Sequence, residues 1–347
     1  MRILVVAPSD SQLLPFAEGI VEELKNLGHE IELVTVTSFF LVGSYFERKM
    51  TKWGIKRFER RYTENILENW KMHSKTLNPD FVLVLCGVHI TPPLREFLKH
   101  YKMIFWLWDH YQRFDVLETL TDFASEIFCF EYSDVKKLNE KYNVPTHYLP
   151  LGVNEKIYYP AECERDIDVS FIGWRSKKRL EFLEKLSDRA IEKNWNVKIG
   201  GFLYDGRHFW KRWVFASKHK NLSKFAENRI LTPSEIAELY RRSKICLNIN
   251  VSEHHSLNPR TFEICATKSF QLMDKGLDAH HLINLETDLA TFDGAEDLLE
   301  KIEFYLAHDE LREKIALSGY NAVIKNCTLK RSVEKLLAQS EVIRGLQ

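Results

Sequence analysis

Two successive series of short apolar segments, separated by longer amphipathic stretches, constrain the fold of this chain more than any other feature. In the first half, five runs rich in β-branched and aromatic residues have the length of strands. They are Ile3–Ala7, Ile31–Val36, Phe81–Leu85, Met103–Trp108 and Ile127–Phe130. Such runs alternating with amphipathic stretches are typical of parallel strands joined by crossover helices. One such stretch ends at Gly28, a natural helix C-terminus, and a long polar stretch at about 45–77 is also expected to be helical.

The alternation is interrupted at residues 144–160. This segment, VPTHYLPLGVNEKIYYP, contains three prolines and a glycine, as an interdomain linker often does. We therefore expect one Rossmann-like domain over residues 1–150 and a second over 151–329. A C-terminal helix at residues 330–347 is expected to pack back onto the first domain.

The alternation then starts again in the second half. Strands are expected at Asp168–Ile172, Val197–Gly200, Arg229–Leu231, Ile245–Ile249 and Phe270–Met273, and helices at Lys177–Lys193, Ser234–Arg242, Arg260–Ala266 and from about Ala295 onward. Thr232, followed by a proline, is a typical helix cap. The expected fold class is α/β, with two Rossmann-like domains that face each other across a cleft. Such domains bind ligands at the carboxyl ends of their strands.

Composition excludes several classes of protein. The 347 residues contain 49 Lys+Arg and 49 Asp+Glu, so a zero net charge gives no reason to expect a nucleic-acid partner. The six cysteines lack a CxxC pair and lie partly in apolar runs, which favours free thiols in a reducing compartment. No window approaches the roughly 18 apolar residues of a membrane span. We expect a cytoplasmic protein.

The segment Ser243–Asp274 is the most informative part of the sequence. An expected strand is followed by the polar loop 254–259 and then by a short helix that starts near Arg260. A helix N-terminus with free backbone N–H groups binds anions, and a guanidinium suits phosphate. Glu263 lies one turn further on, where a carboxylate suits the two hydroxyls of a ribose. On spacing alone, an ordinary Arg–Glu surface pair is an equally good interpretation.

Arg260-Thr261-Phe262-Glu263-Ile264-Cys265-Ala266 resembles the R-x-F-E-x-x-A pattern of GT-B glycosyltransferases, in particular the glycosyl transferases group 1 and CgeB-like family. The similarity extends over about residues 80–340. It includes the run at 149–160, the strand and glycine at 168–173, and several positions among the C-terminal helices, namely Glu296 to Leu306, Arg312, Gly319, Thr328 and Arg331.

The resemblance implies a nucleotide-sugar donor site in the second domain. Glu263 would hold the donor ribose, and Arg260 with the helix N-terminus, including Asn258 and Thr261, would face the diphosphate. Two positions depart from the family pattern. Thr267-Lys268-Ser269 replaces the usual glycine turn, and His255 stands where the retaining branch has a second glutamate. Retaining and inverting mechanisms therefore both stay open.

Other donor-binding candidates follow expected strands. Gly173 would let the backbone approach a phosphate closely, and Arg175 and Lys178 would neutralise its charge, although a glycine at a strand end is more often only a turn. Tyr204, after the strand that ends at Gly200, is a candidate for the nucleotide pocket.

The first domain is expected to hold the acceptor and the general base of an inverting reaction. Candidates at strand ends are Asp109, which is followed by His110, and more weakly His89 and Asp10. A carboxylate or imidazole is needed within hydrogen-bond reach of the attacking hydroxyl. The alternative for Asp109 is a cap of the following turn.

Two clusters of basic and aromatic residues, at 48–61 and 207–220, are not explained by the donor site. Each is most simply a solvated helix face. Such stretches also bind anionic membrane surfaces, or an acidic glycan.

The expected function is sugar transfer from a nucleotide-sugar to a carbohydrate or lipid-linked acceptor, with no bound metal and no cofactor. Alternatives are a GT-B-fold sugar epimerase or phosphorylase and a non-catalytic nucleotide- or glycan-binding protein. The expected location is the cytoplasm, with the inner face of the membrane as a further possibility.

Overall fold

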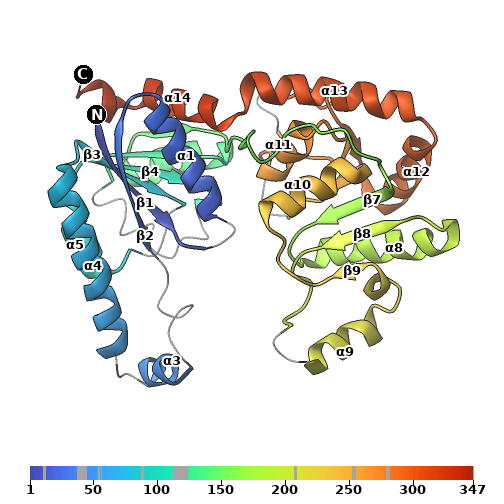
Figure 1. Ribbon diagram of the computed structural model, residues 1–347, viewed down its shortest axis with the longest axis horizontal. Coiled ribbons are helices and arrows are strands. Elements are labelled where there is room, and N and C mark those ends of the chain that lie inside the picture. The colour runs from blue at the N-terminus through green and yellow to red at the C-terminus, as the bar shows by residue number, and fades with distance from the viewer. Residues whose placement is uncertain are drawn as a thin grey trace. The chain divides into compact units, whose positions relative to one another are not determined.

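The computed structural model divides the chain into two compact units. Unit 1 comprises Met1–Leu151 and Leu329–Gln347, and unit 2 comprises Gly152–Thr328. The residues that the structure describes are 1–10, 13–36, 45–53, 55, 57–86, 90–111, 124–206, 209–251, 255–278 and 282–346. Each unit is an α/β sandwich around a parallel sheet (Figure 1).

The sheet of unit 1 has six strands in the order β2-β1-β3-β4-β5-β6, and each neighbouring pair is parallel. The strands are β1 (Arg2–Pro8), β2 (Glu30–Val36), β3 (Phe81–Leu85), β4 (Met103–Leu107), β5 (Glu126–Cys129) and β6 (Thr146–Tyr148). β1 lies between β2 and β3. Because side chains alternate across a strand, Ile3 and Val5 enter one apolar core, and Leu4 and Val6 enter the other.

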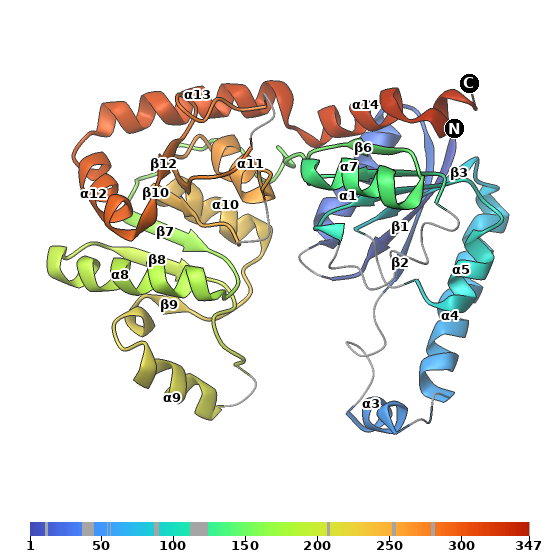
Figure 2. The same cartoon turned by 180° about the vertical axis from the view of Figure 1, so that it is seen from behind.

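Helices cover both faces of this sheet. They are α1 (Leu14–Asn26), α4 (Arg57–Leu77), α5 (Pro92–Leu98), α7 (Tyr132–Tyr142), α14 (Leu329–Gln339) and α15 (Glu341–Arg344). A further helix, α3 (Tyr45–Lys52), lies next to α4 and away from the sheet (Figure 1). α1 and α14 lie side by side over the core that contains Ile3, whereas α4 and α5 cover the core that contains Leu4 (Figures 1 and 2). Gly28, just after α1, has φ +84°, a left-handed conformation that glycine adopts without strain.

The last helices are fastened to unit 1 by a buried carboxylate. Glu126, fully buried on β5, accepts hydrogen bonds from the Ser340 hydroxyl at 2.5 Å and from the Glu341 backbone N–H at 3.0 Å. His147 Nε2 lies 2.7 Å from the same carboxylate. Burial acts to raise the pKa of Glu126, but these partners outweigh it and hold the pKa below its ordinary value.

Unit 2 has a second six-stranded sheet, in the order β12-β11-β10-β7-β8-β9, again with parallel pairs. Its strands are β7 (Ile167–Ile172), β8 (Val197–Gly200), β9 (Ala226–Glu227), β10 (Ser243–Asn248), β11 (Gln271–Asp274) and β12 (Ala290–Phe292). Its helices are α8 (Lys177–Lys193), α9 (Phe209–Lys218), the 3-10 turn η2 (Leu222–Lys224), α10 (Pro233–Arg242), α11 (Pro259–Ala266), α12 (Gly294–Leu306) and α13 (Asp309–Asn326).

One sequence-based expectation for a strand needs correction, and two strands of the structure were not expected. The strand expected at Arg229–Leu231 is wrong. The edge strand is β9, which begins three residues earlier in the sequence and pairs with Ile199 and Gly200 of β8. β6 and β12 were not expected at all. All three strands have only two or three residues, too few for a hydrophobic pattern, and their place in the sheet depends on a partner strand already being present.

Candidate functional site

A network of buried amides fixes the start of α11 at the carboxyl end of β10. Asn248, fully buried at that end, donates to the Thr261 hydroxyl at 3.0 Å and to the Gln271 side-chain oxygen at 3.2 Å. Its own oxygen accepts from the Arg260 guanidinium at 2.9 Å and from Asn258 at 3.0 Å. Asn258 caps the helix by accepting from the Thr261 backbone N–H at 3.2 Å. The predicted residues Asn258, Arg260 and Thr261 are therefore brought together, although the Thr261 side chain is itself buried.

Arg260 and Glu263 have separate partners. The Arg260 guanidinium lies 5.7 Å from the Phe171 ring and donates to the Tyr240 hydroxyl. Glu263, half-buried, accepts a hydrogen bond from the Tyr158 hydroxyl. Within the described part of the chain, no ion pair joins Arg260 to Glu263, so the simple surface pair considered from the spacing is not what forms.

The local environment changes the charge of Glu263. Burial raises its pKa to about 7, although the Arg260 charge and the Tyr158 hydrogen bond both act in the opposite direction. Burial also raises the pKa of Tyr158 and of Tyr240, so both hydroxyls stay protonated at neutral pH. Glu263 therefore changes its charge close to neutral pH, and it lies near Arg260, which is always positively charged.

Two glycine turns meet next to Arg260. The Gly173 N–H donates to the Gly200 carbonyl at 3.1 Å, and Gly201 has φ +119°. A Cβ at Gly201 would lie 2.2 Å from the Gly173 carbonyl oxygen, and one at Gly173 would lie 3.3 Å from the Arg260 guanidinium. Only glycine fits at this contact, which keeps backbone close to Arg260 at the carboxyl ends of β7 and β8.

The other predicted donor-binding residues lie in different settings. Lys178 forms an ion pair with Asp274 at 2.6 Å, so its charge is already matched. Arg175 is exposed, and its backbone N–H donates to the Phe202 carbonyl at 3.0 Å. The Tyr204 ring packs 4.9 Å from that of Phe215, in the core.

Sequence reasoning missed several residues of this site. Tyr158 contacts Glu263, and Tyr240 contacts Arg260. Asn248 fixes the start of α11 through Arg260, and Asp274 pairs with Lys178. One signal was available: an asparagine directly after the apolar run Ile245–Leu247 of a strand requires buried partners. The tyrosines gave no comparable signal because their partners lie far away in the sequence.

In unit 1, two of the three predicted catalytic residues lie at the carboxyl edge of the sheet. Both Asp109 and Asp10 are close enough to Cys86 for their negative charges to raise its pKa. That pKa is about 12, and burial is the main cause of the rise. One Asp109 oxygen accepts from the backbone N–H of His110 at 2.8 Å, as in the capping alternative. His89 lies outside the described residues, as do Glu253 and His254 before α11.

His110 has a partner that the sequence did not predict. Its Nε2 lies 3.1 Å from Asp134 Oδ1, and both side chains are buried. Asp134 also accepts from the Tyr111 backbone N–H at 3.0 Å. Burial raises the pKa of Asp134. A carboxylate that orients an imidazole is the arrangement of a general base.

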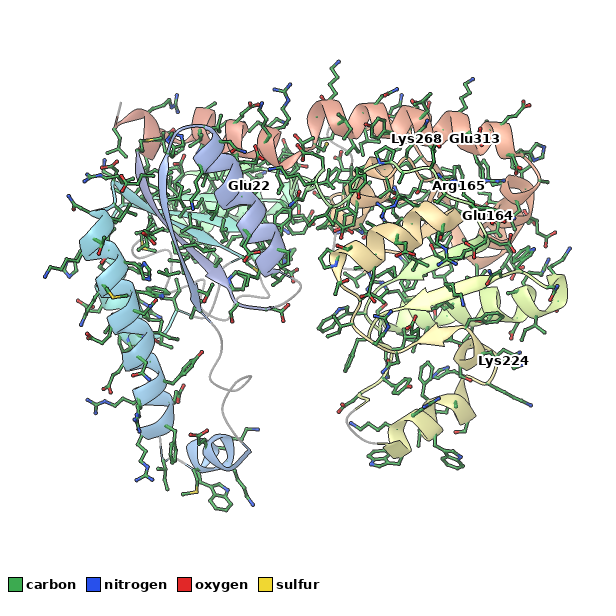
Figure 3. All side chains as sticks on the ribbon, in the orientation of Figure 1. Glu22, Glu164, Arg165, Lys224, Lys268 and Glu313 are labelled. Carbon is green, nitrogen blue, oxygen red and sulfur yellow. The ribbon has the colours of Figure 1, made fainter. Side chains whose placement is uncertain are left out.

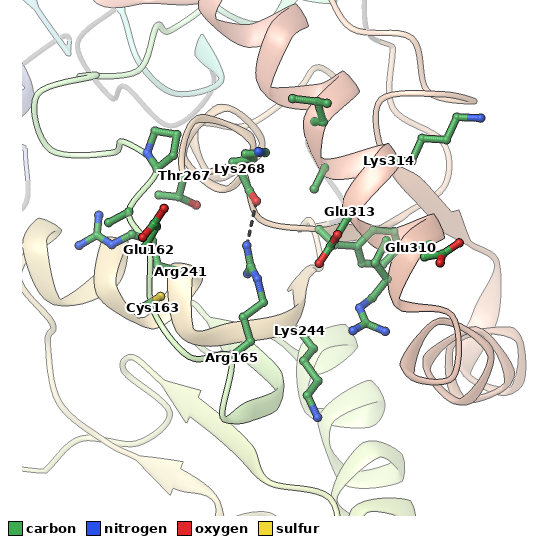
Figure 4. A pocket seen from close by; sticks show the side chains of 16 residues that line it. Glu162, Cys163, Arg165, Arg241, Lys244, Thr267, Lys268, Glu310, Glu313 and Lys314 are labelled. Atoms are coloured by element: carbon green, nitrogen blue, oxygen red, sulfur yellow. Dashed lines mark hydrogen bonds between the residues drawn. The ribbon is translucent and has the colours of Figure 1, made fainter.

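Unit 2 also has a hollow of about 700 Å³ that includes Arg165, Lys244 and Lys268 (Figures 3 and 4). Arg165 donates to the Lys268 carbonyl at 2.9 Å, and Lys244 pairs with Asp168 at 2.7 Å. Arg165 precedes β7 and Lys244 is the second residue of β10, so the hollow lies at the amino ends of the strands, opposite to the start of α11. It is not part of the candidate donor site.

Among the described residues, no three His, Cys, Asp or Glu side chains gather closely enough to hold a metal ion. A separate search of the same residues finds no helix with the length and apolarity to cross a membrane.

Comparison with solved structures identifies the fold as that of GT-B glycosyltransferases. A glycosyltransferase from Rickettsia africae superposes with a TM-score of 0.66 at 17% identity, over 97% of this chain and 96% of that one. The sucrose-phosphate synthase of Thermosynechococcus elongatus gives 0.68 at 11%, over 99% of both chains. The Anabaena protein HepE, solved in complex with UDP and glucose, gives 0.64 at 10%, over 97% and 98%. At these identities the likeness establishes the fold alone.

Sequence comparison agrees. Residues 175–338 match the family model described as glycosyl transferase-like. The spore protein CgeB of Bacillus subtilis is 23% identical over 316 residues, which cover 85% of this chain and 94% of that protein. Together these findings confirm the resemblance to group 1 GT-B glycosyltransferases and indicate a transferase.

Proposed function

We propose that the chain transfers a sugar from a nucleotide-sugar donor to a carbohydrate or lipid-linked acceptor, without a bound metal. The observation that carries the proposal is the arrangement at the start of α11. A cation, a carboxylate and a capped helix N-terminus lie together beside the two glycine turns. We infer that this is the donor site.

Each group of the site suits one part of a nucleoside diphosphate. The Glu263 carboxylate would accept hydrogen bonds from the two ribose hydroxyls. Arg260 and the first backbone N–H groups of α11 would face the diphosphate. Because Asn248 and Tyr240 already hold the guanidinium, its charge is in place before the sugar leaves. Such fixed charge stabilises the departing diphosphate in the transition state.

The acceptor is assigned to unit 1. Asp109 is the proposed general base if the reaction inverts, with Asp10 and His89 as weaker candidates. The His110–Asp134 pair offers an imidazole at the same edge of the sheet. A base must deprotonate the attacking hydroxyl as the bond to the anomeric carbon forms. Asp109→Asn should therefore lower turnover and leave the affinity for the nucleotide unchanged.

UDP is the first nucleotide to test, since HepE, which has the same fold, was solved with UDP and with UDP-glucose. The experiment is a thermal-shift panel with UDP, GDP, dTDP, CDP and CMP, each with magnesium and with EDTA. A ligand at 100 times its Kd adds about 2.7 kcal/mol to the stability of the native state.

A shift with one nucleotide, equal in EDTA, supports the proposal. A shift that requires magnesium contradicts its metal independence. Release of nucleotide from the matching nucleotide-sugar distinguishes an enzyme from a binding protein, because a protein that only binds the donor leaves it intact.

A further inference from the structure

Helix α9 carries two exposed indoles on one of its faces. Trp210 is 50% exposed and Trp213 is 74% exposed, and residues three apart lie on the same side of a helix. The buried Phe215 lies on another side, with its ring 4.9 Å from that of Tyr204 and 4.7 Å from that of His219. Phe215 thus anchors the helix to the core and leaves the two indoles toward solvent.

The segment that carries these indoles is basic, although carboxylates of neighbouring segments lie close to part of it. Residues 206–224 contain six Lys or Arg and no Asp or Glu. Lys211 pairs with Asp205 at 2.8 Å. Arg212, Lys218 and Lys220 form no ion pair with any residue that the structure describes, and Arg207 lies outside the described residues. The nearby Glu184 is engaged by His219 at 2.5 Å.

The helix lies apart from the candidate donor site. In both views of unit 2, α9 lies beyond the edge strand β9, whereas α11 lies at the other end of the unit (Figures 1 and 2). Lys224, at the end of η2, adds a further basic side chain to this part of unit 2 (Figure 3). None of the contacts at Arg260 or Glu263 explains the exposed aromatic residues of α9.

We propose that α9 docks on an anionic lipid surface through Trp210 and Trp213, with Arg212, Lys218 and Lys220 facing the headgroups. An indole has a large apolar body and one N–H donor, and it is most stable at the boundary between acyl chains and water. Each Lys or Arg near an anionic leaflet strengthens binding, and this attraction falls off within a Debye length. The basic side chains of residues 206–224, with no carboxylate among them in the sequence, complement an anionic surface. The proposal is independent of the chemistry at the donor site.

The test is co-sedimentation of the full chain with vesicles of phosphatidylcholine alone or with 30–40% phosphatidylglycerol. We expect binding to the anionic vesicles that falls with added salt, and about tenfold weaker binding to neutral ones. The double variant Trp210→Ala, Trp213→Ala should lose at least about tenfold in affinity for anionic vesicles. The matched control is Phe304→Ala, which removes an exposed aromatic side chain (46% exposed) from α12 of the same unit and should bind like the wild type.

A second variant guards against misfolding. Arg212→Glu with Lys218→Glu keeps both indoles and should weaken binding to anionic vesicles to the level of neutral ones. Each variant is checked by its melting temperature and by nucleotide binding, which should stay unchanged. Failure of the wild type to bind anionic vesicles overturns the proposal, as does equal binding by the double tryptophan variant. Self-association that the tryptophan variant abolishes, without vesicle binding, also overturns it and assigns the face to a second copy of the chain.

Discussion

The Tyr158 hydroxyl donates a hydrogen bond to the Glu263 carboxylate, and this contact joins two segments of unit 2 that are far apart in the sequence. Tyr158 follows the start of the unit, whereas Glu263 lies on α11. The contact helps to orient the carboxylate. It also opposes the rise in pKa that burial causes.

The first prediction concerns pH. The pKa of Glu263 is raised to about 7, so the carboxylate that accepts ribose hydroxyls is fully present only above that pH. The affinity for nucleoside diphosphate should rise between pH 6 and pH 8. In Glu263→Gln, which cannot titrate, it should be low and nearly constant. Isothermal titration calorimetry over this range measures both, and a flat profile for the wild type would contradict the role of the carboxylate.

The second prediction concerns Tyr158→Phe. Loss of the hydroxyl removes a hydrogen bond that lowers the pKa of Glu263, so the midpoint of the pH profile should move upward. Affinity at pH 7 should fall by about tenfold, the effect of one charge-assisted hydrogen bond. Tyr159→Phe is the matched control, because the Tyr159 ring is 48% exposed and lies under Arg241. The two variants behaving alike would argue against the positioning role of Tyr158.

The third prediction separates a steric clash from backbone strain. Gly201→Ala brings a Cβ to 2.2 Å from the Gly173 carbonyl oxygen, at φ +119°. Gly276→Ala has a similar φ of +97° but no atom within 4 Å. The strain alone costs about 1–2 kcal/mol, and the clash should add about 1–3 kcal/mol at Gly201. Urea unfolding measures both variants. Equal losses would mean that the two glycine turns do not need their close contact.

The fourth prediction tests the attachment of the C-terminal helices to unit 1. Ser340→Ala removes a hydrogen bond to the buried Glu126 carboxylate and should cost about 1–3 kcal/mol at pH 7. Because the partners hold the folded-state pKa of Glu126 below its ordinary value, their contribution is present above that value and is lost as pH falls through the folded-state pKa.

The difference between wild type and Ser340→Ala should therefore shrink in acid. Ser217→Ala, at an exposed position on α9, is the control and should change stability by less than about 0.5 kcal/mol. A difference that stays constant from pH 7 into acid would show that Ser340 acts independently of the charge on Glu126.

Strands of four or more residues with mostly buried side chains could be predicted from the sequence. Ile3–Ala7 lies within β1, and Phe81–Leu85 and Val197–Gly200 coincide with β3 and β8. The helix at Lys177–Lys193 was also predicted to the residue. Such segments carry their own pattern of burial. β9 was misplaced because a two-residue edge strand is defined by its neighbour and has no pattern of its own.

The residues of the candidate site also fall into two groups, those that a local sequence pattern predicts and those that it does not. Arg260 and Glu263 are readable because they share one helix turn, and Asn258 because it caps that helix. Other contacts join residues of different elements, so no local pattern predicts them. They are those of Tyr158 and Tyr240 and the Lys178–Asp274 pair. The resemblance indicated which residues face the donor, whereas the groups that position those residues required the fold.

The measurement that tests the account most directly is a calorimetric titration of UDP, or of the nucleotide that the thermal-shift panel selects, into wild type, Glu263→Ala and Glu300→Ala. Glu300 is an exposed glutamate on α12 of the same unit. The account predicts saturable binding at one site in wild type and Glu300→Ala, without magnesium. It predicts at least about a hundredfold weaker binding in Glu263→Ala, with the melting temperature of the free protein preserved. Unchanged affinity in Glu263→Ala would contradict the assignment of the donor site to the start of α11.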